Sequence, residues 1–393
     1  MIYFDNAATS FPKAPGVAEA MSAFLANDAA NPGRAGHRMA VAAEKMLDDV
    51  RLKLTRMVNG SDPRRLIFAM NCTDAINMAI KGVIHPTTTA DDTHVITTVL
   101  EHNSVSRPLQ AMADSGRISL SRVPCDDEGF VDPEAIRKAI GPTTKLIATT
   151  HASNVLGTIQ DAAAIGAIAR EHDLLFLLDA AQTIGAAPID IEAMRVDLLA
   201  FPGHKSLLGP TGTGGLYVGE RVPEPAEHSA AGLRPWREGG TGGDSSTPVQ
   251  PALFPYYLEG GTPNTVGVAG LGAGIDYVLE HDPAAMLAHE QQMVQKLIDR
   301  FTDDSRFRVY GCGDASRRVG TLSLNLLEYE PGDVGSILDD SFETAVRPGL
   351  HCAPYAHRHL GTFPGGTVRI SPGVFNTTEE LDGLIDALDQ IAG

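Results

Sequence analysis

The first two thirds of the chain alternate between short apolar runs and segments whose apolar residues recur at helical spacing. Each run is short enough to be one buried strand, and an amphipathic segment such as 161–171 separates some runs from the next. The runs that we expect to be strands are 66–68, 94–98, 145–149, 174–178 and 197–201. Strands that alternate with helices predict an α/β fold with a mostly parallel sheet covered by helices on both faces.

The pattern changes near residue 264, where long amphipathic segments begin. One apolar face of these segments holds Met286, Met293, Leu297, Ile298 and Phe301. Short strands are expected at 307–310, 320–325 and 367–371. The pattern Thr377-x-x-Glu380 is typical of a capping box at the start of a last helix. We therefore expect a large domain over residues 15–263 and a smaller α/β domain over residues 264–393, joined by the N-terminal segment 1–14.

Length and composition limit the class of protein. The 393 residues exceed one simple core, and 31 Lys and Arg against 49 Asp and Glu give a net charge of −18, which argues against a nucleic-acid partner. Cysteines 72, 125, 312 and 352 show no paired spacing, so we expect no disulfide framework and a reducing compartment. The start lacks a signal pattern, and no apolar run approaches the roughly 18 residues of a membrane span. We expect a cytoplasmic protein without a membrane partner.

Two of the apolar runs end in residues that can do chemistry. The run 174–178 is followed by Asp179, and the run 197–201 is followed closely by Lys205. The carboxyl ends of strands are where open α/β sheets build their sites, and an amine there can form a Schiff base. A buried acid is costly unless a positive group meets it, and the protonated ring nitrogen of pyridoxal 5′-phosphate (PLP) is such a partner. The pair therefore predicts a PLP site.

The segment 69–77 supplies groups that can hold a phosphate. It follows an expected strand, and Thr73 is the N-cap that we expect for a helix running to Lys81, with Gly82 as its stop. Anions bind at helix starts because unpaired N–H groups and the helix dipole both favour negative charge. An ordinary capped helix would give the same local pattern.

Seven short motifs occur in order along the chain. They are DNAAT at 5–9, EHNS at 101–104, HASNVLGT at 151–158, DAAQ at 179–182, GHK at 203–205, EGGTPN at 259–264 and RPGLHC at 347–352. Together they resemble the cysteine desulfurase branch of the class V aminotransferase family, whose members are fold type I PLP enzymes. The resemblance spans residue 3 to about residue 377, and its short stretch from Arg347 to Arg369 resembles the second type of desulfurase.

The resemblance implies a role for each motif residue. Lys205 would carry the cofactor and move the α-proton of the substrate, and His102 would stack on the cofactor ring and act in proton transfer. Asp179 would pair with the ring nitrogen, Gln182 would bond the phenolic oxygen, and Asn154 would lie near that oxygen and the substrate carboxylate. Arg369 would bind that carboxylate as a bidentate donor. The phosphate would be held by Cys72, Thr73, His204 and, from the second subunit of a homodimer, Thr241.

Cys352 determines the expected reaction. By the resemblance, its thiolate attacks the sulfur of L-cysteine, which leaves L-alanine and a persulfide that a sulfur-acceptor protein can receive. A lone Cys is otherwise often a small buried apolar residue. A metal site formed by His351, Cys352, His357 and His359 matches no standard zinc spacing.

The chain departs from the family pattern at Pro202, where Ser or Thr is usual, at Asn71, where Gly is common, and at Leu350, which replaces a His. Three alternatives to cysteine desulfurase stay open at this point. A selenocysteine lyase would use nearly the same site, a class V aminotransferase would not need Cys352, and a cofactor-bearing partner protein in a sulfur-transfer assembly would not be catalytic.

Overall fold

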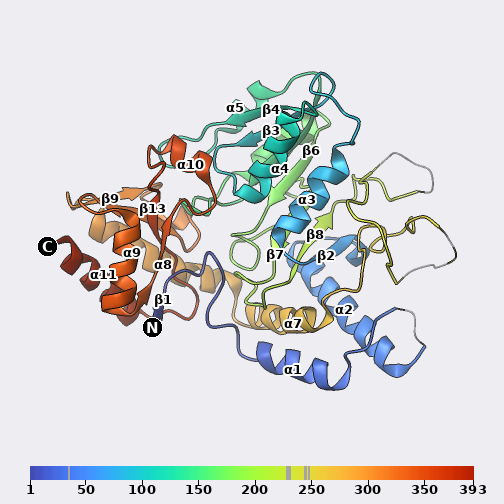
Figure 1. The fold of residues 1–393 in the computed structure, drawn as a ribbon, viewed down its shortest axis with the longest axis horizontal. Coiled ribbons are helices and arrows are strands. Elements are labelled where there is room, and N and C mark those ends of the chain that lie inside the picture. Colours follow the sequence, from blue (N-terminus) through green and yellow to red (C-terminus); the bar gives the residue numbers. More distant parts are fainter. Residues whose placement is uncertain (34–35, 227–231, 243–245, 247) are drawn as a thin grey trace.

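The computed structural model of the protein describes residues 1–33, 36–226, 232–242, 246 and 248–393. A large sheet and a smaller sheet, each covered by helices, lie next to one another (Figure 1). No helix in the described part of the chain is long and apolar enough to cross a membrane.

The larger sheet has seven strands. Their spatial order is β2 (Leu66–Ala69), β8 (Gly214–Val218), β7 (Leu198–Pro202), β6 (Leu175–Asp179), β5 (Thr144–Thr150), β3 (His94–Thr98) and β4 (Ser119–Val123). The pairs from β7 through β6, β5 and β3 to β4 are parallel, and β8 is antiparallel to both of its neighbours. The central strands are Leu-rich because both of their faces are buried.

Helices cover both faces of this sheet. Helices α3 (Cys72–Val83) and α4 (Asn103–Asp114) pack on one face, where Leu198 and Ala200 of β7 point. Leu199 and Phe201 of the same strand point to the other face. The helices on that face are α2 (Arg38–Met57), α5 (Pro133–Ala139), α6 (Ala162–Glu171) and α7 (Thr265–Glu280).

The smaller sheet is antiparallel, with spatial order β12 (Arg347–Gly349), β13 (Thr367–Ile370), β10 (Leu322–Leu326) and β9 (Phe307–Tyr310). A separate apolar core joins it to α8 (Pro283–Phe301), α9 (Pro331–Phe342) and α11 (Thr378–Ala392). The short helix α10 (Pro354–His359) follows β12. Both bonds of the predicted capping box are present: Glu380 N–H donates to the Thr377 hydroxyl, and Thr377 N–H donates to the Glu380 carboxylate.

The N-terminal segment contacts both sheets. Strand β1 (Ile2–Tyr3) pairs with β11 (Thr344–Ala345) in the smaller part, and Asp5 forms a bridge with Ser371. A few residues later the backbone N–H of Ser10 and the Lys13 ammonium both donate to the carbonyl of His204, at 3.0 and 2.9 Å. The chain then enters α1 (Val17–Asn27), which packs against α7. The segment therefore joins the smaller sheet to the peptide that precedes Lys205.

The predicted strands and the α/β class are confirmed, with boundaries shifted by one or two residues. The expected strand 320–325 is β10, which begins at Leu322. The prediction that Thr73 caps α3 is wrong. Asn71 is the N-cap, because its side-chain oxygen accepts the N–H of Asp74 at 2.9 Å, and α3 continues through Gly82 to Val83. Part of the Gly- and Pro-rich segment 231–251 lies outside the described residues. The domain limits remain a prediction.

Candidate active site

Four neighbouring parallel strands deliver side chains to one edge of the large sheet. His102 follows β3, Asn154 follows β5, Asp179 ends β6 and Lys205 follows β7. They meet around a cavity of about 190 Å³. The predicted site residues that line it are Cys72, Thr73, His102, Asn154, Asp179, Gln182, His204, Lys205 and Arg369. Residues far apart in the sequence therefore share one cavity because parallel strands end at the same edge.

The Lys205 amine lies in a buried, positive environment. Burial, together with the nearby Arg369 guanidinium, lowers its pKa to about 8, although the Asp179 carboxylate acts in the opposite direction. Near neutral pH a useful fraction of the amine is therefore unprotonated. Only the neutral amine is nucleophilic, so this environment suits a lysine that forms a Schiff base.

The Asp179 carboxyl group is buried, and no cation among the described residues is in direct contact with it. Its Oδ1 accepts the N–H of Ala181 at 2.9 Å and the thiol of Cys72 at 3.4 Å. Burial raises its pKa, and the Ala181 N–H and the Lys205 charge only partly oppose this. A cationic ring nitrogen at this position would stabilise the carboxylate. The environment of Asp179 therefore fits the pyridinium of PLP.

The cavity lining also includes groups that can hold a phosphate. Cys72 and Thr73 lie in the first turn of α3, where backbone N–H groups have no partner within the helix. The Thr73 hydroxyl is 2.8 Å from the Ser104 hydroxyl. Within the described residues, the buried Nδ1 of His204 has no hydrogen-bond partner. Pro202 also lines the cavity and offers no hydroxyl. This set of donors suits an anion at a helix start.

His102 is held in one orientation as the N-cap of α4. Its Nδ1 accepts the N–H of Ser104 at 3.1 Å, which places the ring proton on Nε2. Burial lowers its pKa to about 4, with Lys205 as the next cause. The imidazole is therefore neutral near pH 7, which suits a ring that stacks on a flat cofactor.

The Gln182 amide donates to the carbonyl of Ala7 at 3.2 Å.

Arg369 lies on β13 with a side chain that is only 1% exposed. Its Nη1 donates to the carbonyl of Asn154 at 3.0 Å, and its Nη2 forms an ion pair with Asp5 at 2.6 Å. In the described structure its buried Nε has no partner.

Sequence reasoning missed Asp5 and Arg347 as site residues. Arg347 stands directly opposite Arg369 in the β12–β13 pair and lines the cavity, and its place at the start of the RPGLHC motif was the available signal.

The Cys352 loop has an unusual backbone conformation. His351 and Cys352 have φ values of 46° and 59°, in the left-handed region that costs a non-glycine residue about 1 kcal/mol or more. Two bonds of 2.7 Å hold the loop, from the Asn154 amide to the His351 carbonyl and from the Asn103 N–H to the Cys352 carbonyl. Cys352 is half-buried, whereas the other cysteines are buried, and its sulfur is 3.7 Å from Nη2 of Arg347.

His351 lies next to Cys352 in this loop and is buried. Burial lowers the pKa of His351 to about 2, and its Nε2 lies 3.1 Å from the carbonyl of Thr367. Among the residues that the structure describes, no three His, Cys, Asp or Glu side chains gather as a metal-binding group.

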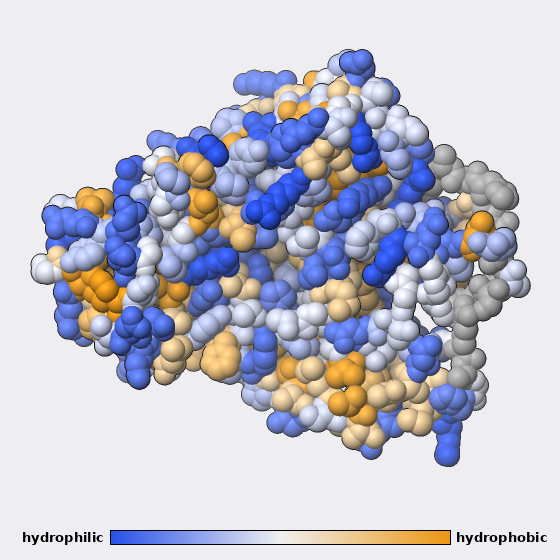
Figure 2. All heavy atoms as spheres, viewed as in Figure 1, coloured by the Kyte–Doolittle hydropathy of each residue, from blue (hydrophilic) through white to orange (hydrophobic). Residues whose placement is uncertain are grey.

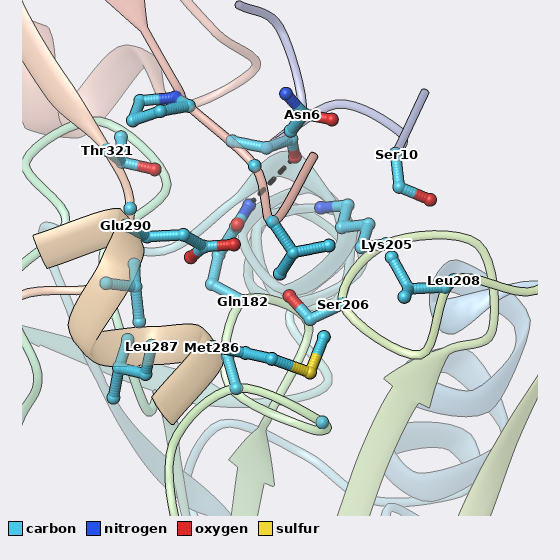
Figure 3. Close-up of a pocket in the computed structure, with 18 of the residues that line it drawn as sticks. Asn6, Ser10, Gln182, Lys205, Ser206, Leu208, Met286, Leu287, Glu290 and Thr321 are labelled. Atoms are coloured by element: carbon cyan, nitrogen blue, oxygen red, sulfur yellow. Dashed lines mark hydrogen bonds between the residues drawn. The ribbon is translucent and has the colours of Figure 1, made fainter. Parts of the chain in front are cut away.

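A second cavity lies on the other side of Lys205. Figure 3 shows Glu290, from α8, on one side of it and Lys205 on the other. Lys205, Gln182 and Ala7 line both cavities and separate them. Burial raises the pKa of Glu290 to about 8, so its carboxyl group is largely protonated at neutral pH. No sequence signal distinguished Glu290 from the other polar positions of α8.

Thr241 was also predicted to bind the cofactor, but it does not line the cofactor cavity of its own chain. It lines a different cavity, of about 510 Å³, together with Arg51 and Glu259, which form an ion pair of 2.7 Å. A contact of Thr241 with the cofactor of a second subunit stays a prediction.

Comparison with known proteins identifies the family. The family described as aminotransferase class V matches residues 2–384 of the chain. The chain belongs to the class V aminotransferase family. A probable cysteine desulfurase from Methanothermobacter thermautotrophicus is 36% identical to this chain. The match covers 100% of this chain and 95% of the relative.

Solved structures support the same grouping. The chain is similar to the apo structure of a cysteine desulfurase from Thermococcus onnurineus NA1, with a TM-score of 0.91 and 31% identity over 100% of this chain and 94% of the other. The cysteine desulfurase CsdA from Escherichia coli gives a TM-score of 0.86 and 26% identity over 99% and 94%. The chain therefore has the fold type I architecture that its motifs predicted. The predicted resemblance to the family is confirmed.

Proposed function

We propose that this protein is a PLP-dependent cysteine desulfurase that converts L-cysteine to L-alanine and holds the sulfur as a persulfide on Cys352. The observation that carries the proposal is the position of the Cys352 thiol. It lies 3.7 Å from Arg347, which lines the same cavity as Lys205 and Arg369. The names of the relatives at 31–36% identity support the same activity.

The residues around the cavity fit PLP. Asp179 would hold the ring nitrogen, His102 would cover the ring, and Gln182 would hold the phenolic oxygen. Asn154 lies beside the same region, with its amide donating to His351. The phosphate would be held by Cys72, Thr73 and His204. When bound, PLP supplies an electron sink that makes the α-proton of an amino acid acidic.

The protein's own residues perform the remaining work. Arg369 and Arg347 provide positive charge for the substrate carboxylate, and the Lys205 amine accepts the α-proton. The Cys352 thiolate attacks the sulfur of the substrate, so that a sulfur–sulfur bond forms while the bond between Cβ and sulfur breaks. Cβ then takes a proton, the Lys205 ammonium returns a proton to Cα, and L-alanine leaves. Arg347 stabilises the attacking thiolate because it is a cation close to the sulfur.

The experiment compares the wild type with Cys352→Ser. Purified holoenzyme is incubated with L-cysteine and a reducing thiol, and both L-alanine and sulfide are measured. The variant should lose at least about 99% of both products while keeping the absorbance band of its cofactor. Equal product from both forms would reject the persulfide mechanism.

Two further assays address the alternative activities. Amino transfer from an amino donor to a keto acid, retained in full by Cys352→Ser, would identify an aminotransferase. Turnover of L-selenocysteine in preference to L-cysteine would identify a selenocysteine lyase.

We also infer a cytoplasmic homodimer. The location of Thr241 outside the cofactor cavity of its own chain supports a contact across a subunit interface. The four cysteines are all free, which supports a reducing compartment. Sedimentation velocity measures the assembly, and Thr241→Ala should weaken PLP binding if the contact exists.

A further inference from the structure

Three side chains anchor the segment that follows Cys352 to the part of the molecule that contains the large sheet. Tyr355 lies on α10, three residues after Cys352, and its hydroxyl donates to Oε1 of Gln110 at 3.1 Å. Nη2 of Arg122, on β4, donates to the same oxygen at 2.8 Å. The Arg122 guanidinium lies over the Tyr355 ring, 3.9 Å from its centroid. Each member of this anchor cluster (Gln110, Arg122 and Tyr355) therefore contacts the other two.

The orientation of the Gln110 amide is fixed by its neighbours. Its Nε2 donates to the Asp114 carboxylate at 2.7 Å, one turn further along α4. A carboxylate only accepts and a guanidinium only donates, so the amide oxygen must face Arg122 and Tyr355. The cluster is half-buried, and Figure 2 shows strongly hydrophilic residues over α4, the helix that carries Gln110. Because water competes with each bond of a half-buried group, the contacts of the cluster must act together.

Helix α4 contacts the Cys352 segment at two points. The backbone N–H of Asn103, the first residue of α4, donates to the Cys352 carbonyl at 2.7 Å. Gln110 lies about two helical turns later, or about 10 Å along the helix axis. Between these points, Ala353 and Ala356 are fully buried in the core of the large sheet. One helix therefore holds the chain on both sides of the thiol.

The Cys352 loop needs such support because of its backbone. His351 and Cys352 both have positive φ values, which a non-glycine residue keeps only where its surroundings impose them. Hydrogen bonds to the carbonyls of these two residues hold the loop from one side. The anchor cluster holds it from the other side through Tyr355. Release of Tyr355 would let the two residues relax and would move the thiol from its position 3.7 Å from Arg347.

We propose that the anchor cluster positions the Cys352 thiol for attack on the substrate sulfur, with Tyr355 as its central residue. The proposal rests on the proposed desulfurase function and adds positioning residues that lie outside the cofactor cavity. None of the three belongs to the seven motifs that indicated the family.

The two chemical steps depend on the cluster to different extents. Attack of the thiolate requires the two sulfur atoms to be aligned, and a misplacement of about 1 Å can slow such a step about a hundredfold. Movement of the α-proton uses the Lys205 amine and does not involve the Cys352 thiol. Loss of the anchor should therefore slow the first step and spare the second.

The test measures these two steps separately in holoenzyme. Mass spectrometry follows persulfide formation on Cys352 during one turnover of L-cysteine without a reducing thiol. NMR follows exchange of the Cα proton of L-alanine in heavy water, which needs Lys205 but not the thiol. We expect Tyr355→Leu to slow persulfide formation at least about tenfold and to leave the exchange within about twofold. Tyr355→Phe keeps the ring and loses only the hydroxyl bond, so it should slow persulfide formation about threefold.

A double-mutant cycle tests whether Gln110 acts through Tyr355. Gln110→Met keeps the length of the side chain and removes the shared oxygen, so it should slow persulfide formation about threefold or more. The double variant with Tyr355→Phe should be little slower than Gln110→Met alone, because both changes remove the same bond.

Hydrogen exchange of backbone amides gives a readout that needs no turnover. In the cofactor-free protein, Tyr355→Leu should speed exchange in residues 350–357, because the bond from the Ala353 N–H to the Leu350 carbonyl opens more often. Peptides from α11 should keep their exchange rates. Tyr329→Leu is the matched control, because Tyr329 is an exposed tyrosine that follows β10 and lies outside the cluster, and it should change none of these measurements.

Three results would overturn the proposal. These are an unchanged rate of persulfide formation in Tyr355→Leu, equal slowing of persulfide formation and Cα exchange, and additive losses in the double variant. If Tyr355→Leu does not fold, Tyr355→Phe and Gln110→Met decide by the same criteria. Absence of any persulfide in the wild type would instead reject the proposed function, and hydrogen exchange would then decide by itself whether the cluster holds the loop.

Discussion

Replacing Asp5 by Asn tests how the arginine for the substrate carboxylate is held. The Asp5 carboxylate accepts Nη2 of Arg369 at 2.6 Å, and the two side chains are 21% and 1% exposed. Asn keeps an oxygen acceptor of nearly the same size and removes the charge. A hydrogen bond between charged groups contributes about 1.5–3 kcal/mol and a neutral one about 0.5–1.5 kcal/mol, so the loss is about 1–1.5 kcal/mol.

That loss corresponds to about a tenfold change in binding, because about 1.4 kcal/mol is one factor of ten. We expect the KM for L-cysteine to rise about tenfold and kcat to stay within about twofold, because substrate and transition state bind through the same carboxylate. Steady-state production of L-alanine measures both constants. Binding of L-alanine, followed by cofactor absorbance, should weaken by a similar factor.

Asp197→Asn is the matched control. Asp197 forms a buried ion pair of 2.8 Å with Arg221 next to the first residue of β7, at the opposite end from Lys205. This variant should lower Tm without changing KM. An unchanged KM in Asp5→Asn would show that the carbonyl of Asn154 suffices to orient Arg369. A lower KM would show that Asp5 competes with the substrate carboxylate, and either result refutes the reasoning.

Three other predictions concern ionisation and packing. Because the pKa of Lys205 is about 8, the rate at which the cofactor-free protein rebinds PLP should rise between about pH 7 and pH 9, measured by absorbance; a midpoint near 10.5 would contradict it. Glu290 stays protonated in the folded chain up to about pH 8 but ionises near 4.5 when unfolded, so the stability that it contributes falls as pH rises between these values. Glu290→Gln should therefore raise the free energy of unfolding in urea by roughly 1–2 kcal/mol more at about pH 8 than at about pH 5, and an equal effect at both would contradict this. Leu388→Ala should lower the free energy of unfolding by about 2–5 kcal/mol because Leu388 is fully buried, whereas Gln390→Ala, an exposed position of the same helix, should change it by less than about 0.5 kcal/mol.

Much of the large sheet could be predicted from the sequence because its central strands are buried on both faces and so are almost entirely apolar. Two strands of the large sheet were not predicted, for different reasons. Strand β4 (Ser119–Val123) is an edge strand that is half-polar and only partly buried, and β8 (Gly214–Val218) begins inside a Gly-rich turn. Strand β4 lacks an apolar run, and the run in β8 is only three residues long and follows two glycines.

The candidate site divides in a similar way. Residues at strand ends could be predicted together because parallel strands end at one edge. The pairing of Asp5 with Arg369 joins residues 364 positions apart, and no local pattern specifies it. The start of α3 offered two good N-cap residues, Asn71 and Thr73, and only the folded backbone decides between them.

The N-terminal segment has a consequence for how the two sheets move. It is hydrogen-bonded to the smaller sheet at Asp5 and Asn6, and Ser10 and Lys13 bond to the carbonyl that immediately precedes Lys205. A rotation of the smaller sheet therefore pulls on the backbone of the lysine itself. We therefore expect a displacement of the smaller sheet to be coupled to the position of the reactive amine through the N-terminal segment.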